Sequence, residues 1–106
     1  MPKPIEFGVS VCVNQKTGDL EALYFQVRRG KVARTREIQA NVLVDYDDAG
    51  HIMGIELLGP CHTTIIERYL EKKRAPLSVR RFVQNKIPAE FIAPETGEEA
   101  AHVVRA

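Results

Sequence analysis

The segment 41–58, NVLVDYDDAGHIMGIELL, decides the fold of this chain. Apolar and polar residues alternate on both sides of an acidic turn, and a period of two is typical of strands with one buried face. The turn 47–50 has Asp first and Gly last, as a type I turn prefers. The expected hairpin places three pairs on its buried face: Tyr46 with His51, Val44 with Met53, and Val42 with Ile55. A slip of one residue would bury Asp45 and Glu56, so the apolar pattern favours this register.

Three further strands are expected before this hairpin. Residues 34–38 are charged, which is typical of an exposed sheet edge. Residues 22–27 and 5–13 alternate between apolar and polar side chains, so each strand is expected to bury one face. In the first strand that face carries Ile5, Phe7, Val9, Val11 and Val13.

Two helices are expected after the sheet. The first covers about 64–74, with Thr64 as its N-cap and Glu67 completing a capping box. The second covers about 78–87, with Ser78 as its N-cap. Both carry apolar residues at helical spacing, which predicts one buried stripe on each.

These elements predict an α+β protein. We expect an antiparallel β-meander of four to five strands over 5–58, with two C-terminal helices packed on one face. Residues 1–88 are expected to form a single domain, and 89–106 a partly ordered C-terminal tail in which Phe91 and Ile92 are the candidates for docking.

Composition bounds the possible partners. The chain has 106 residues, 44% of them apolar, which suits one domain. Its net charge of +1 gives no overall electrostatic field that would attract nucleic acid or membrane. Two cysteines are too few for a disulfide framework. No apolar run approaches the roughly 20 residues of a membrane span, and the first residues lack a signal-peptide pattern. We therefore expect a soluble cytoplasmic protein without a membrane partner.

Several ordered motifs resemble a small bacterial family classified as a domain of unknown function. They are ALYFQV at 22–27, TRE at 35–37, VDYD at 44–47, Gly50, and GIELL at 54–58. The family has Asp-Ala before Leu-Tyr, whereas this chain has Glu21-Ala22. The resemblance implies a small antiparallel sheet with a helix packed on it, no established activity or cofactor, and an antitoxin-like or partner-binding role.

The acidic hairpin is close to a calcium-binding loop. Residues 45–56 match the pattern D-x-[DN]-x-[DN]-G-x₅-E except at Ala49, which removes one side-chain ligand. The flanks are strand-like, whereas the calcium motif needs helices. In a hairpin Asp45 and Glu56 would lie about 10 Å apart, too far to share one ion. A plain acidic turn is the favoured interpretation.

Cys61 and His62 are the other chemically suggestive pair. They precede an expected helix N-terminus, which would stabilise a thiolate. A Cys-His nucleophile also needs an orienting group and an oxyanion donor, and the sequence identifies neither. The favoured interpretation is a structural cysteine. The three histidines lack metal-ligand spacing, so no catalytic, cofactor-binding or metal-ligating residue is assigned.

Charge is distributed unevenly along the chain. Residues 67–86 carry seven basic and two acidic side chains, a net charge of +5, whereas 89–106 have a net charge of −3. The basic helical region could contact nucleic acid through Arg68, Lys72, Arg80 and Arg81. It has no helix-turn-helix spacing and no row of aromatic residues, so solvated helix faces are favoured.

Three functions therefore stand in order. The first is a non-enzymatic protein-interaction module that forms a homodimer or holds a small partner protein, by strand addition at a sheet edge. Asp47 and Asp48 form a candidate partner-contact rim. The second is nucleic-acid contact through the basic helical region. The third is a small enzyme or ligand-binding protein, which requires a polar pocket near Cys61 and His62.

Overall fold

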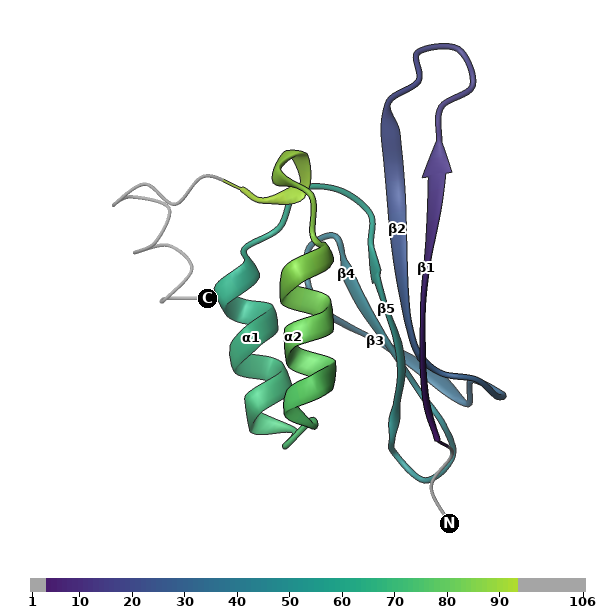
Figure 1. Ribbon diagram of the computed structural model, residues 1–106, viewed down its shortest axis with the longest axis vertical. Helices are drawn as coiled ribbons and strands as arrows, with labels where there is room; N and C mark the ends of the chain where they lie inside the picture. The colour runs from purple at the N-terminus through teal and green to yellow at the C-terminus, as the bar shows by residue number, and fades with distance from the viewer. Residues whose placement is uncertain (1–3, 94–106) are drawn as a thin grey trace.

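The computed structural model describes residues 4–93, which form one sheet covered by two helices (Figure 1). The strands are β1 (Ile5–Val13), β2 (Leu20–Arg28), β3 (Arg34–Gln39), β4 (Val42–Tyr46) and β5 (Ile52–Leu57). The helices are α1 (Thr63–Lys72) and α2 (Leu77–Lys86), followed by the 3-10 turn η1 (Ala89–Phe91).

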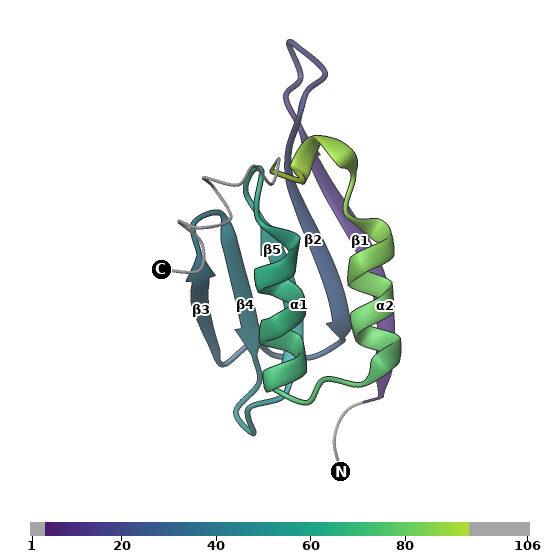
Figure 2. The same cartoon turned by 90° about the vertical axis from the view of Figure 1, so that its left-hand side faces the viewer.

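All neighbouring strands are antiparallel, in the order β1-β2-β5-β4-β3. The hairpin β1–β2 and the meander β3–β4–β5 meet where β5 pairs with β2. Both helices lie on one face of this sheet, as Figures 1 and 2 show together. The expected α+β class, with an antiparallel sheet and both helices on one side, is confirmed. No helix in the range 4–93 is long and apolar enough to cross a membrane.

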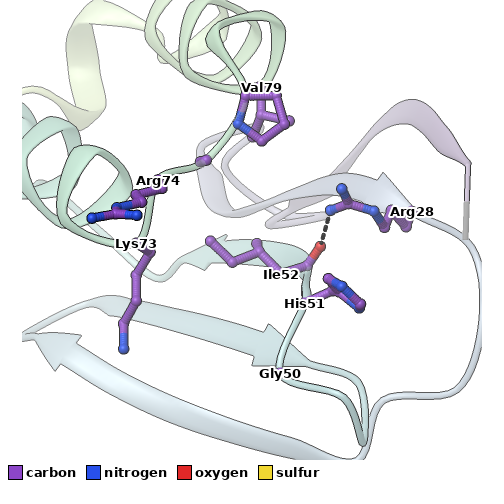
Figure 3. A pocket seen from close by; sticks show the side chains of 9 residues that line it. Arg28, Gly50, His51, Ile52, Lys73, Arg74 and Val79 are labelled. Carbon is purple, nitrogen blue, oxygen red and sulfur yellow. Dashed lines mark hydrogen bonds between the residues drawn. The ribbon is translucent and has the colours of Figure 1, made fainter. Parts of the chain in front are cut away.

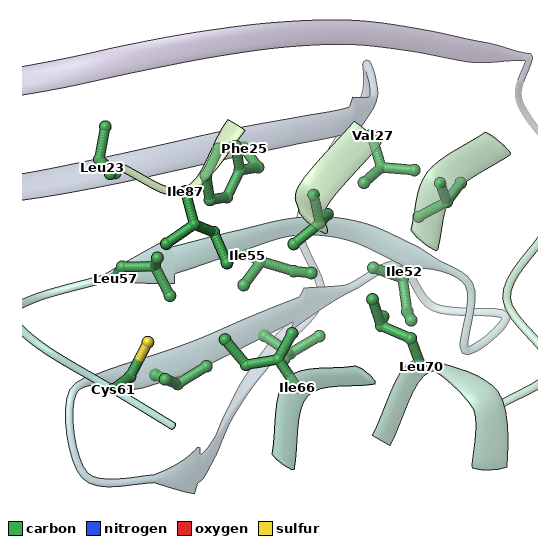
Figure 4. Close-up of a cluster of buried hydrophobic side chains, with 14 of the residues drawn as sticks. Leu23, Phe25, Val27, Ile52, Ile55, Leu57, Cys61, Ile66, Leu70 and Ile87 are labelled. Atoms are coloured by element: carbon green, nitrogen blue, oxygen red, sulfur yellow. The ribbon is translucent and has the colours of Figure 1, made fainter. Parts of the chain in front are cut away.

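The hydrophobic core fills the space between the helices and β2, β5 and β4 (Figure 4). From the helices, Ile66 and Leu70 of α1 and Val79 and Val83 of α2 are buried at intervals of four residues. Burying one such side chain contributes about 1.5–3 kcal/mol, so these four anchor the helical layer. From the sheet, the core receives Leu23, Phe25, Val27, Val42, Val44, Tyr46, Ile52, Ile55 and Leu57.

The register of the β4–β5 hairpin differs from the expected one. Val44 pairs with Ile55 and Tyr46 pairs with Ile52, with an irregularity between Asp45 and Tyr46. The turn is tighter than expected, because the Asp47 N–H donates to the His51 carbonyl and Gly50 adopts φ +88°. Ile52 consequently joins the core cluster beneath the helices, where we expected Met53. Met53 is buried as expected, at 1% exposure, but outside that cluster.

Strand β1 departs most from expectation. It forms one edge of the sheet, and its apolar side chains are 38–60% exposed, whereas the alternating pattern predicted a buried face. The reason is the length of the hairpin, since β1 and β2 extend past the end of the helical layer (Figure 1) and α2 contacts only the start of the strand, through Phe82 and Phe7. A bulge between Ile5 and Gly8 also places Ile5 opposite Arg28, so the regular apolar row is Phe7, Val9, Val11 and Val13.

The helix ends also differ in detail. Helix α1 begins at Thr63 after His62, which makes no side-chain capping bond, so the expected N-cap Thr64 lies inside the helix. Helix α2 begins at Leu77 after Pro76, one residue before the expected cap Ser78. A proline before the first turn is compatible with the helix, since its missing N–H removes no helical bond.

The packed body continues past the expected boundary at residue 88. Phe91 is buried, and Ile92 forms a parallel bridge with Cys61. The remainder of the expected tail, 94–106, lies outside the described residues.

Candidate interaction surface

The free edge of β1 is the most exposed apolar feature of the described chain. Val9, Val11 and Val13 pair with or lie beside Phe25, Leu23 and Leu20 on β2, so they share the face that carries the helices. Val11 is nonetheless 60% exposed. Figure 1 shows the β1–β2 hairpin reaching past the end of the helical layer. Val9 and Val13 are 46% and 45% exposed, so the row is covered only in part.

Helix α2 covers only the start of this row. The Phe82 ring stacks on Phe7 with ring centroids 4.2 Å apart, and it meets Phe25 edge-on at 6.0 Å. This contact fastens β1 to the helical layer at one end. Beyond Phe7 the strand is held to the protein by its ladder with β2.

The opposite edge has the reverse character. Strand β3 carries Arg34, Arg36 and Glu37 among exposed residues, as the sequence predicted for an edge strand. Charged side chains discourage another strand from pairing there. In β1 the regular stretch 7–13, FGVSVCV, contains no charge at all. The two edges therefore differ sharply in their readiness to accept a further strand.

The face away from the helices carries a small polar cluster. The Tyr24 hydroxyl donates to Asp45 Oδ2 at 2.9 Å, and the Thr35 hydroxyl donates to Asp45 Oδ1 at 2.5 Å. Burial and the bond to Asp45 raise the pKa of Tyr24. A Cβ on Gly54 would lie 1.9 Å from the Tyr24 oxygen, so this glycine makes room for the ring. The cluster ties β2, β3, β4 and β5 together.

Glu56 lies on the same face as this cluster. It pairs with Tyr24 on one side and Leu43 on the other, and Asp45 pairs with Gly54. Asp45 and Glu56 are thus diagonal neighbours, closer than the three ladder positions we expected. The Asp45 oxygens are occupied by two hydroxyl donors, however, and no group of three His, Cys, Asp or Glu side chains within 4–93 is arranged to hold a metal.

Asp47 is a turn residue rather than part of an exposed rim. Its carboxylate is buried and accepts the backbone N–H of His51 at 2.8 Å and that of Ala49 at 3.0 Å. The His51 ring lies 3.2 Å away. These bonds, that from the His51 N–H foremost, hold the pKa of Asp47 below its ordinary value. Of the two rim candidates, Asp48 is the exposed one.

Cys61 is buried at the corner between β5 and α1. Its thiol points to the Phe91 carbonyl at 3.6 Å, and its backbone pairs with Phe91 and Ala93. Burial raises the pKa of the thiol to about 11, so it is protonated at neutral pH. His62 is engaged through its backbone, which exchanges hydrogen bonds with the Gln39 side chain. This geometry favours a structural cysteine over a nucleophile.

The basic helical candidates do not form one site. Arg68 and Lys72 are exposed and lie one turn apart on α1, away from the buried Ile66 and Leu70. The two candidates on α2, Arg80 and Arg81, are adjacent in the sequence. They point in different directions, because successive helical residues are about 100° apart. Arg81 is exposed, whereas Arg80 is half-buried, with an Nε that has no hydrogen-bond partner in the described range.

Three hollows in the described part of the chain are candidate ligand sites. The one near the start of α2 has a volume of about 290 Å³ and is lined by Arg28, His51, Lys73 and Arg74 among others. Its cations do not converge: Figure 3 shows Arg28 bonded to the Ile52 carbonyl while Lys73 and Arg74 point away. None of the three hollows is lined by Cys61 or His62, where the enzyme hypothesis requires a pocket.

Residues 18–59 match the model of a family described as a protein of unknown function, DUF2283. The resemblance to a small family of unknown function is thereby confirmed. The matched segment contains β2 to β5 and the Tyr24–Asp45–Gly54 cluster, whereas β1 and both helices lie outside it. Comparison with curated proteins and with solved structures found no match.

Sequence reasoning missed the free edge of β1 because alternation alone does not reveal what covers a face. One signal was available, namely that the stretch 7–13 lacks any charged residue. The sequence placed Tyr24 and Asp45 on polar faces, but it could not show that β2 and β4 flank the same strand.

Proposed function

We propose that this protein is a non-enzymatic protein-interaction module that binds a partner by adding a strand at β1. The observation that carries the proposal is the contrast between its two edges: β3 is charged, whereas β1 is uncharged over 7–13 and displays exposed valines. An unpaired strand of this kind offers a row of backbone donors and acceptors to an incoming strand.

Two features support a binding role over a packing defect. Beyond Phe7 the exposed row continues over Val9, Val11 and Val13, whereas apolar residues at a protein surface are normally scattered singly. The strand is also anchored by the Phe7–Phe82 stack, so it is held ready for pairing. An antitoxin-like role would use the same surface to hold its partner.

A tagged-protein recovery from the native cell tests the proposal. Wild-type protein is compared with Val11→Lys and with Val32→Lys, which places the same charge on a 40% exposed valine outside any strand. A chain recovered in stoichiometric amount with wild type and Val32→Lys, but lost with Val11→Lys, is the expected result.

The bound chain should then protect the backbone amides of β1 from hydrogen exchange when the purified components are mixed. If recovery of every bound chain is equal for the three proteins, or if no chain is recovered, β1 is not a binding edge and the proposal fails.

A further inference from the structure

The sequence of β1 is complementary to itself. After the bulge the strand reads FGVSVCV over 7–13, four apolar residues alternating with three small ones. The alternation is the same when the stretch is read backwards, so an antiparallel copy would bring apolar residues opposite apolar ones. Glu6 lies before the regular stretch and pairs with Arg29, so no like charges meet in such a ladder.

We infer that the partner at β1 is a second copy of this chain, paired antiparallel to the first about a twofold axis at Ser10. This inference rests on the proposed function, since both use the same edge. Ser10 faces Ser10 of the second copy. On the helix side, Phe7 faces Val13 and Val9 faces Val11, and on the other side Gly8 faces Cys12.

This register uses the whole regular stretch of β1. A shift toward Val9 as the centre would pair Val13 with Ile5, which the bulge has already moved out of line. A shift toward Val11 would leave Phe7 and Gly8 without partners. The axis at Ser10 is therefore the one that pairs all residues from Phe7 to Val13.

The pairing also joins the two apolar rows. Residues directly opposite each other in a ladder point to the same face, so both helical layers would lie on one side of a continuous ten-stranded sheet. The exposed valines of the two copies then form one apolar floor between the two α2 helices. This arrangement removes from water the side chains that a single copy leaves 45–60% exposed at Val9, Val11 and Val13.

The other edge explains why assembly stops at two. Pairing through β1 is isologous, because the same strand is used by both copies and none is left for a third. The remaining edges are the two β3 strands, whose charged side chains oppose further growth. A closed dimer follows, rather than a filament.

Sedimentation of the purified protein over a concentration series gives the first test. Wild-type protein and Val32→Lys are expected to form dimers in the micromolar range, whereas Val11→Lys should dissociate at least about tenfold more readily, since its lysine enters an apolar ladder. Urea unfolding confirms that each variant is folded before it is compared.

Disulfide trapping gives the second test and fixes the register. In a Cys12→Ser background, Ser10→Cys places two thiols directly opposite, with Cα atoms about 4.5–5.5 Å apart, within the range that a disulfide spans. Mild oxidation should cross-link this variant nearly completely. The wild-type Cys12 is the matched control on the same face, because its two copies would lie four residues apart, about 14 Å, and should stay free.

The outcomes separate this inference from the proposed function. A wild-type protein that stays monomeric and a Ser10→Cys variant that does not cross-link overturn the second-copy partner, while a different chain recovered through β1 leaves the proposed function standing. Cross-linking of Cys12 instead of Ser10→Cys overturns the register.

Discussion

At the scale of single residues, Gly54 shows how one missing side chain organises the sheet. It lies between Asp45 and Gln26 in the ladder, and the Tyr24 ring occupies the space above it. Because the ring can lie there, its hydroxyl reaches Asp45 on the far strand. The glycine thus permits a hydrogen bond to a charged group, which contributes about 1.5–3 kcal/mol.

Gly54→Ala should therefore destabilise the protein by about 1–3 kcal/mol, because the new methyl group displaces the Tyr24 ring. Urea unfolding measures the effect. Gly8→Ala is the matched control in another strand, since its Cβ would meet nothing closer than 3.6 Å. Equal stability of the two variants would show that the ring does not depend on Gly54.

Asp47 predicts an acid-dependent stability. The pKa of Asp47 in the folded protein lies below the ordinary 3.8. Its contribution to the free energy of unfolding is therefore complete above pH 3.8, and it is lost as the pH falls from 3.8 through the folded pKa. Asp47→Asn should be less stable than wild type at neutral pH, and the difference should shrink toward pH 2. Thermal unfolding from pH 2 to 7 measures it, with Asp48→Asn as the exposed control. A difference that is constant with pH would contradict the turn bonds as its cause.

At the scale of elements, the helical layer determines how much of the sheet is buried. Helix α1 contributes Ile66 and Leu70 to the core, and α2 contributes Val79 and Val83. Two helices of ten residues cover the three inner strands. Among the ring contacts of the described chain, only the stack of Phe82 on Phe7 joins α2 to the outer strand β1. Strand β1 is consequently attached at one end and free along the rest.

Phe82→Ala should remove that attachment. The side chain is half-buried against Phe7 and Phe25, so we expect a loss of about 1.5–3 kcal/mol, below the cost of removing a fully buried phenylalanine. Leu77→Ala on the same helix is the control, because Leu77 is 51% exposed. Hydrogen exchange should also rise in β1 more than in β5. A uniform increase over the whole sheet would mean that Phe82 supports the core rather than the edge.

At the scale of the whole molecule, the two sheet edges differ in character. One edge is charged, whereas the other is apolar and exposed, and we propose that only the apolar edge pairs with a further strand. An association of this kind stabilises the folded state by mass action, since the unfolded chain has no β1 edge to pair.

The Tm of the wild-type protein should therefore rise with protein concentration, by roughly 3 °C per tenfold above the dissociation constant for a dimer of this size. The Tm of Val11→Lys should depend less on concentration, because its dimer dissociates more readily, whereas Val32→Lys should follow wild type. Calorimetry at three concentrations measures the slope. A slope of zero for wild type would contradict association of the purified chain.

Much of the fold follows from the sequence because local patterns encode it. Alternation marked the strands, and the apolar stripes together with the prolines marked both helices to within two residues. The predicted β4–β5 register was wrong because the tight turn at Asp47 and the irregularity after Asp45 shift which residues pair. Neither feature can be recognised from the pattern of apolar residues. The Tyr24–Asp45–Thr35 cluster was not predicted, for a related reason. It joins three strands, and the alternation of apolar and polar residues does not encode the order of strands in the sheet.

The sequence by itself determined which segments of this protein are strands and helices, and which side of each is apolar. Only the tertiary structure decided whether an apolar side is covered, because burial depends on the neighbour that packs against it. In β4 the neighbour is a helix, and the row Val42, Val44 and Tyr46 became core. In β1 the helical layer ends too soon, and the equally apolar row Val9, Val11 and Val13 stays exposed at the surface.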